Sequence, residues 1–163
     1  MVRLARLEEA EALWQIRNQA VRYGCKEAYG EKAVIAWTPD CMPSGYLRAI
    51  SQNPFFVIDT PGFPVATGFL DIKQQSVEAI FTLPAFMGNG YATQILKAIK
   101  TEARSRGIAS LTLAATPNAV SFYQRHGFKL LRETLFHSAL AGDLRCMDMQ
   151  ADLTQENAYR RPD

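Results

Sequence analysis

The stretch 81-FTLPAFMGNGYATQIL-96 sets the architecture of the chain. Its apolar first half passes through Pro84 into two glycines, Gly88 and Gly90, and its second half has helical periodicity. Glycines at such a turn let the backbone approach a ligand closely, and the ligand is often a phosphate at the helix N-terminus. The stretch therefore predicts a strand, a tight turn and a helix that together bind a phosphate.

The flanking segments place this unit inside one mixed sheet. Its helix is expected from about Gly90 to Arg106, because apolar residues share one face and Gly107 suits the C-terminal cap. Along the chain we expect N-terminal helices, then a meander, a strand–helix–strand crossover that contains this helix, a short helix and a final hairpin. Strands are expected at 2–5, 55–60, 65–74, 77–83, 108–115, 128–136 and 144–153, and further helices at 7–23, 30–37, 43–52 and 116–127. We expect a single domain, 1–163, with an α/β fold: a mixed (α+β) sheet of about six to seven strands flanked by helices.

Composition and charge argue against several classes of protein. The 163 residues are 48% hydrophobic, which suits one soluble domain with its own core. The net charge is only +2, so nucleic acid is not an expected partner. No apolar run approaches the roughly 18 residues of a membrane span, and charges come too early for a signal peptide. The polar segment 155–163 is expected to fray.

The cysteines Cys25, Cys41 and Cys146 lie far apart and form no CxxC pair. This spacing argues against a disulfide framework or a zinc site, so no metal is expected, and it favours a reducing, cytoplasmic setting. Cys25 and Cys41 have no activating neighbour in the sequence. A covalent acyl-cysteine intermediate is therefore not expected.

Two common phosphate-binding loops do not fit the glycine turn. A P-loop requires GxxxxGK followed by Ser or Thr, and the chain contains no such string. A dinucleotide-binding fingerprint requires a third glycine where Thr93 stands. It also requires an acidic residue after the next strand, which ends in Ala114 and Ala115. Both ATP and dinucleotides are thereby disfavoured.

A third interpretation fits the turn together with a second motif. The turn 87-MGNGYA-92, a helix, a strand and then 116-TPNAVSFYQRHGF-128 resemble the acetyl-CoA-binding core of the GNAT N-acetyltransferase superfamily. The resemblance covers about residues 77–130, and 28-AYGEKAVIAWTPD-40 is similar to a subgroup of small bacterial members with unassigned substrate. Two positions depart from the family pattern. Met87 stands where Gln or Arg is usual, and Thr116 stands where Asn is common.

The resemblance implies an N-acetyltransferase that moves the acetyl group of acetyl-CoA to a primary amine by direct attack in a ternary complex. Backbone N–H groups at the start of the helix would hold the pyrophosphate. The strand containing Phe81 and Thr82 would pair with the pantetheine arm, and an N–H near Thr82 would polarise the thioester carbonyl. The implied coenzyme-binding residues are Phe81, Thr82, Gly88, Asn89, Gly90, Tyr91, Ala92 and Thr93.

Tyr123 is the expected general acid, because the family uses this tyrosine to protonate the departing thiolate. Without the resemblance, Tyr123 reads as part of an apolar helix face. The base stays open between Glu78, a chain of water molecules and an acid of the substrate. Glu78 is the residue we name, because it shares strand alternation with Ile80 and Thr82. A lone histidine is more often structural, so His126 and His137 rank lower.

The N-terminal helices, about residues 7–52, are implied to shape the acceptor pocket. Tyr29, Trp37 and Asp40 are candidates by position, although Trp37 fits the core better. The acceptor is expected to be a small-molecule or peptide amine, and the final strands could form a homodimer edge. Two alternatives remain: a non-catalytic acyl-CoA-binding module or sensor, and an oxidoreductase with a nucleotide cofactor, which the failed fingerprint disfavours.

Overall fold

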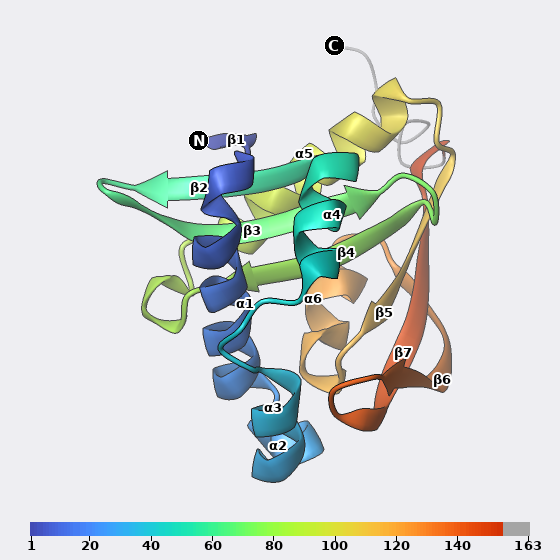
Figure 1. Cartoon of the computed structure of the whole chain (residues 1–163). Coiled ribbons are helices and arrows are strands. Elements are labelled where there is room, and N and C mark those ends of the chain that lie inside the picture. Colours follow the sequence, from blue (N-terminus) through green and yellow to red (C-terminus); the bar gives the residue numbers. More distant parts are fainter. Residues whose placement is uncertain (155–163) are drawn as a thin grey trace.

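The computed structural model describes residues 1–154 and forms one seven-stranded sheet in the order β1-β2-β3-β4-β5-β7-β6 (Figure 1). β4 and β5 run parallel, and all other neighbours run antiparallel. The strands are β1 (Val2–Leu4), β2 (Phe55–Thr60), β3 (Phe63–Asp71), β4 (Ser76–Thr82), β5 (Ser110–Ala115), β6 (Lys129–Ser138) and β7 (Gly142–Asp152). The expected mixed sheet is confirmed, while the expected fraying of 155–163 lies outside the described residues.

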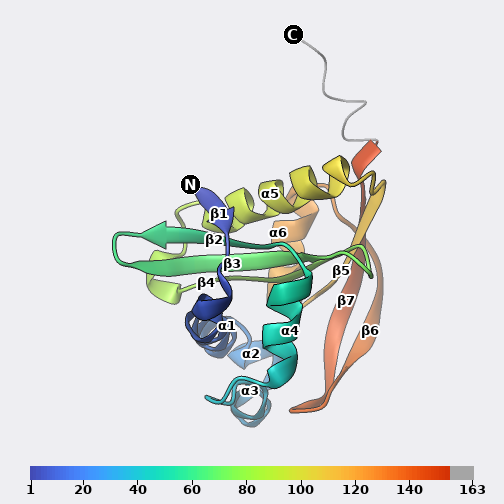
Figure 2. The same cartoon turned by 45° about the horizontal axis from the view of Figure 1, so that its top comes forward.

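Helices cover both faces of the β1–β4 half of the sheet. Figure 2 shows α5 above these strands, with α1 and α4 below them. The helices are α1 (Ala10–Gly24), α2 (Lys26–Tyr29), α3 (Glu31–Trp37), α4 (Ser44–Gln52), α5 (Tyr91–Ser105) and α6 (Val120–Arg125), with short 3-10 turns at Leu7–Glu9, Pro84–Phe86 and Pro117–Ala119. Sequence analysis missed α2, because four residues are too few to display a periodic apolar face.

Separate apolar clusters hold these layers together. On one side of the sheet, Ile95 and Ile99 of α5 are fully buried against strand residues such as Val65 and Leu111. On the other side, Leu13 of α1 packs in a cluster with residues of β2 and α4. The apolar stripe of α5 expected from its sequence is therefore the seam between helix and sheet.

The sheet opens in its middle, between β4 and β5. One residue pair, Ser76 with Thr112, joins these strands, and the Thr112 N–H donates to the Gln75 carbonyl at 3.2 Å. In Figure 1, β2, β3 and β4 run across the view, whereas β5, β7 and β6 run down it. β4 therefore leaves β5 soon after Ser76, and the two strands enclose a gap.

A β-bulge bends β4 beside this gap. Thr67 pairs with Phe81 and Phe69 pairs with Glu78, so three steps along β4 oppose two along β3. Ala79 inside the bulge has a φ of 54°, in the left-handed region that side chains other than glycine rarely adopt. Gly68 on β3 lies opposite. A Cβ at Gly68 would come within 2.8 Å of the Ile80 side chain, so the bulge needs a glycine there.

We expect Gly68→Ala to destabilise the protein by roughly 1–3 kcal/mol, because the added methyl group overfills a closed contact with Ile80 and Ile95. Gly45→Ala is the matched control. Its Cβ would meet nothing within 4 Å, and alanine favours the helix α4. Thermal melting should show a lower Tm for Gly68→Ala alone. Equal melting of the two variants would contradict this account of the bulge.

β6 is one edge of the sheet and belongs to the final strands, which could form a homodimer edge. Most of its side chains are exposed, and Leu130, Leu131 and Leu135 are each about half exposed. These exposures accord with an association surface, but the homodimer stays a prediction. Within residues 1–154, no helix is long and apolar enough to cross a bilayer.

Candidate active site

Two cavities meet where β4 and β5 diverge. The first, here the glycine-turn cavity, has a volume of about 510 Å³ and is lined by residues of α1, β4, α5 and α6. The second, here the aromatic cavity, has a volume of about 480 Å³ and is lined by residues of α1, α3, β4 and the β6–β7 hairpin, among others. Phe81 and Thr116 line both. A molecule in one cavity can therefore touch a molecule in the other.

The glycine turn ends in an uncapped helix N-terminus. Gly90 is the N-cap of α5 with a φ of 79°, Gly88 has a φ of 85°, and no side chain caps the helix. The first N–H groups of α5 therefore keep their partial positive charge for a ligand. Of the implied coenzyme-binding residues, Asn89 alone does not line the cavity; its side-chain amide donates to the Phe86 carbonyl at 2.9 Å and closes the turn.

The edge of β4 that faces the gap has backbone groups unpaired by any strand. The Leu83 N–H donates to the Val65 carbonyl of β3 at 2.9 Å. Since successive N–H groups of a strand point to opposite sides, the Thr82 N–H points away from β3 and into the gap. An extended ligand arm could pair with this edge as an added strand does.

Tyr123 on α6 is buried and lines neither of the two cavities. It is 8% exposed, and its ring contacts Phe122 and Phe128 edge-on at 5.1 and 5.7 Å between centroids. Burial, and to a smaller extent the charge of Glu78, raise the pKa of Tyr123 above its usual value. The phenol of Tyr123 therefore keeps its proton at neutral pH. It also interacts electrostatically with the carboxylate of Glu78, the expected base.

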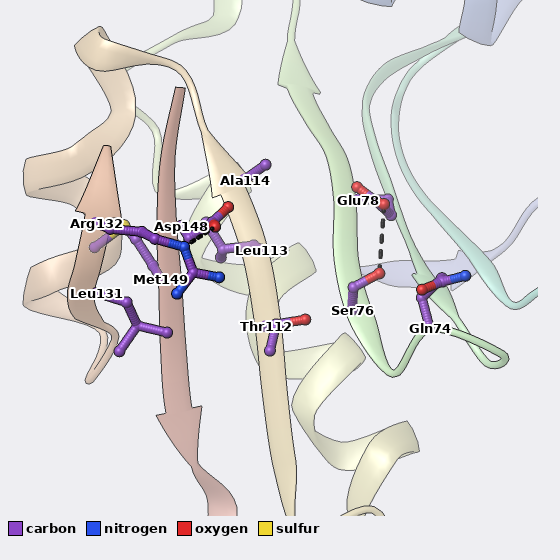
Figure 3. A pocket seen from close by; sticks show the side chains of 10 residues that line it. All are labelled: Gln74, Ser76, Glu78, Thr112, Leu113, Ala114, Leu131, Arg132, Asp148 and Met149. Carbon is purple, nitrogen blue, oxygen red and sulfur yellow. Dashed lines mark hydrogen bonds and ion pairs between the residues drawn. The ribbon is translucent and has the colours of Figure 1, made fainter. Parts of the chain in front are cut away.

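Glu78 occupies the junction between the aromatic cavity and a third, more polar hollow of about 410 Å³ (Figure 3). Burial is the main cause that raises its pKa to about 7; the charge of Asp71 adds to the rise, and a hydrogen bond from Ser76 Oγ at 3.3 Å opposes it. Glu78 is therefore not an exposed carboxylate at the end of a strand, because its side chain is half-buried. It is partly ionised at neutral pH, as a general base should be.

The polar hollow connects Glu78 with the outside of the sheet. In Figure 3, Glu78 and Ser76 on β4 stand across the gap from Ala114 on β5, and the Arg132–Asp148 ion pair of 3.1 Å lies beyond. Thr112 and Gln74 also line the hollow. These hydroxyl, amide and carboxylate groups suit a chain of water molecules.

Two of the three expected acceptor residues reach the aromatic cavity. Tyr29 and Trp37 line it, with ring centroids 5.9 Å apart. Trp37, expected to fit the core better, is half-buried: it packs against a small core cluster and also lines the cavity. Asp40 is exposed, pairs with Arg22 at 3.4 Å and does not line the cavity, so its assignment was wrong.

Other titratable groups stand outside this arrangement. His126 Nε2 lies 3.2 Å from Thr93 Oγ1, His137 Nδ1 lies 2.6 Å from Asp143 Oδ1, and neither histidine lines the cavities. Burial raises the pKa of the Cys25 thiol. Within residues 1–154, no three His, Cys, Asp or Glu side chains cluster as a metal site would require.

Comparison with protein-family models matches residues 25–150 to the acetyltransferase (GNAT) domain. The chain belongs to the GNAT acetyltransferase family. This match includes the glycine turn, both catalytic candidates and most of the sheet. No curated protein sequence matches the chain.

Solved structures share the GNAT fold at low sequence identity. A GCN5-related N-acetyltransferase from Rhodopseudomonas palustris has a TM-score of 0.85 at 20% identity, covering 93% of this chain and 94% of that one. The PaiA N-acetyltransferase from Thermoplasma acidophilum, solved with coenzyme A, has a TM-score of 0.74 at 17% identity, covering 93% and 98%. YncA from Salmonella typhimurium, described as an acetyltransferase and solved with acetyl-CoA, has a TM-score of 0.69 at 18% identity, covering 100% and 97%.

Several residues that line the two cavities of this GNAT site were not predicted from the sequence. Tyr46 and Phe136 come from α4 and β6, outside both motifs, and no local pattern points to them. Arg17 had a readable signal, because it is a charged residue on the otherwise apolar face of α1. Arg125, which lines the glycine-turn cavity, sits inside the second motif but at one of its variable positions.

Proposed function

We propose that this GNAT domain transfers the acetyl group of acetyl-CoA to a primary amine by direct attack in a ternary complex. The observation that carries the proposal is the meeting of the two cavities at Phe81 and Thr116, beside the unpaired edge of β4. Acetyl-CoA would occupy the glycine-turn cavity and the amine the aromatic cavity. The coenzyme and the acceptor would then present their reacting atoms at the shared wall.

The coenzyme would be held at two places. The first turn of α5, from Gly88 to Thr93, would bind the pyrophosphate through backbone N–H groups, including that of Asn89. The pantetheine arm would pair with β4 at Phe81 and Thr82. Among the cavity residues, Arg125 offers a positive charge to the phosphates of the coenzyme.

The reaction would need one base, one polarising donor and one acid. Glu78 takes a proton from the ammonium group of the acceptor, directly or through water, and the free amine attacks the thioester carbonyl. The Thr82 N–H stabilises the oxygen that becomes negative. When the new C–N bond has formed and the C–S bond breaks, Tyr123 donates its proton to the thiolate, and the second proton that the attacking nitrogen loses as the amide forms returns to the Tyr123 phenolate. The polar hollow gives Glu78 a route to return its proton to solvent.

We expect Gly90→Ala to weaken acetyl-CoA binding by about tenfold or more, because a methyl group would stand between the helix N-terminus and the pyrophosphate. Gly107→Ala at the other end of α5 is the matched control. Both glycines have positive φ, 79° and 75°, and a Cβ at either would meet nothing within 4 Å. Both variants should lose similar stability, and titration calorimetry should show weaker binding in Gly90→Ala alone. Equal affinities would remove the glycine turn from coenzyme binding.

The transferase is tested by release of free CoA from acetyl-CoA across a broad panel of amines. Release with even one amine supports the transferase. Thermal stabilisation by acetyl-CoA without release from any amine would favour the binding module instead.

The three cysteines are free in the structure, and the cytoplasmic setting expected from their spacing stays a prediction.

A further inference from the structure

The aromatic cavity contains one positive charge, that of Arg17, and within residues 1–154 no acidic side chain forms an ion pair with it. Arg17 and Glu78 are the charged residues among the described residues that line it. The Arg17 guanidinium lies over the Trp14 ring at 4.3 Å from the centroid and 5.3 Å from that of Trp37. Most other walls are aromatic or aliphatic, as Phe69, Phe81, Phe136 and Leu144 show. A half-buried cation in such surroundings is costly unless a counter-charge is supplied.

The hydrogen bonds of Arg17 leave one edge of its guanidinium available. Nη1 donates to Asn18 Oδ1 at 2.9 Å and to the Trp37 carbonyl at 2.8 Å, and both acceptors are neutral. Within residues 1–154, Nε and Nη2 make no hydrogen bond and no carboxylate forms an ion pair with Arg17. Nε and Nη2 are the pair of donors that bind a carboxylate side-on in bidentate fashion.

Burial acts on Arg17 as expected for an unbalanced charge. It lowers the pKa of Arg17 to about 10, against smaller opposing effects of Tyr46 and Cys25. The guanidinium is still positively charged at neutral pH. Its charge repels acceptors with several positive groups and attracts one with a negative group.

We propose that the acceptor is an amino acid, whose carboxylate binds Nε and Nη2 of Arg17, whose amine points to Glu78 and whose body packs on the aromatic walls. This proposal rests on the proposed transferase function and assigns its substrate class. The cavity, about 480 Å³, is of the size that small-molecule sites commonly have. The competing account is that Arg17 only ties α1 to the end of α3 through the Trp37 carbonyl. The hydrogen bond to the Trp37 carbonyl uses only Nη1, so this account does not explain why Nε and Nη2 make no hydrogen bond within the described residues.

The test compares matched acceptors that differ by one carboxylate. L-phenylalanine is paired with phenethylamine, L-leucine with isoamylamine and 4-aminobutyrate with butylamine, and the other common L-amino acids extend the panel. Release of CoA gives kcat/KM for each. The wild type should prefer the carboxylate-bearing member of at least one pair by tenfold or more. Arg17→Met should abolish that preference by lowering kcat/KM for the carboxylate-bearing member about tenfold more than for its plain amine, a change of ratio that a purely structural role would not produce.

Arg22→Met is the matched control for the variant. Arg22 lies on the same helix and donates to the Thr38 carbonyl at 2.6 Å, but it does not line the cavity. Its removal should leave the preference intact. A wild type that accepts plain amines without preferring carboxylates, or an Arg17→Met variant that keeps the preference, would overturn the proposal and leave the transferase standing. If Arg17→Met does not fold, the wild-type preference decides alone. Absence of CoA release from every acceptor of this panel, with release from a peptide amine, would overturn this proposal alone, whereas absence of release from every amine of both panels would refute the transferase itself.

Discussion

Replacing Tyr123 with phenylalanine is expected to lower kcat by about tenfold to a hundredfold while acetyl-CoA affinity stays nearly unchanged. General acid catalysis typically contributes about 10²–10⁴-fold, but a thiol with a pKa near 8.5 is already a fair leaving group. The effect should therefore fall at or below the lower end of that range. Steady-state rates of CoA release and titration calorimetry with acetyl-CoA measure the two quantities.

The structure makes this substitution unusually clean. The Tyr123 hydroxyl forms no hydrogen bond within residues 1–154, and phenylalanine keeps the ring contacts with Phe122 and Phe128. The fold should tolerate the change, which thermal melting verifies. Tyr23→Phe, an exposed tyrosine on α1, controls for the loss of a hydroxyl group. Equal turnover in wild type and Tyr123→Phe would remove Tyr123 from the mechanism.

Glu78→Gln is expected to lower kcat/KM by about a hundredfold at neutral pH and to change the pH profile. Glutamine keeps the shape and the contact with Ser76 but cannot accept a proton. In the wild type, kcat/KM should rise as pH increases through about 7, where Glu78 loses its proton. In Glu78→Gln this rise near pH 7 should disappear. The kcat/KM should then increase only at higher pH, where the ammonium group of the acceptor loses its proton in solution. A limb near pH 7 that persists in Glu78→Gln would assign the base to another group.

The same variant should gain stability at alkaline pH. The folded-state pKa of Glu78, about 7, lies above its ordinary 4.5, so the native protein binds more protons than the unfolded chain between these values. The free energy of unfolding of the wild type therefore falls as pH rises from about 4.5 to above 7. Glu78→Gln avoids this loss and should gain roughly 2 kcal/mol relative to wild type between pH 4.5 and pH 8. Urea unfolding at both pH values measures it, with exposed Glu27→Gln as the control.

The parts of the site that the sequence predicts are those made by local backbone. Gly88 and Gly90 stand in a strand–turn–helix unit, and their positive φ values are a requirement that glycine meets better than any other residue. The apolar stripe of α5 likewise follows from its own spacing. Glycine and periodicity are readable without knowledge of the rest of the chain, and so the turn, its helix and the mixed sheet were predictable.

Features that depend on distant partners were not predictable in this way. The bulge at Ala79 lies where the register between β3 and β4 shifts, next to Gly68, and no pattern within β4 alone predicts it. Trp37 was expected to belong to the core and does pack against a core cluster, but its sequence does not reveal that it also lines a cavity together with Phe136 of β6. Asp40 lies near Trp37 in sequence, but its carboxylate turns outward to Arg22.

Because β4 and β5 are joined at the pair of Ser76 and Thr112 and then diverge, the centre of the sheet contains a narrow opening, and its width restricts which ligands can enter. α1 and α5 both contact β4, from opposite faces of the sheet. A polypeptide strand entering beside β4 would carry side chains toward both helices, whereas a slender, sparsely branched arm would not. We therefore expect the unpaired backbone of β4 to accept a slender ligand arm more readily than a polypeptide strand. An unpaired strand at the outer edge of a sheet is open to pairing with other protein chains. The unpaired edge of β4 differs because it lies between α1 and α5, which we expect to leave room only for a slender ligand.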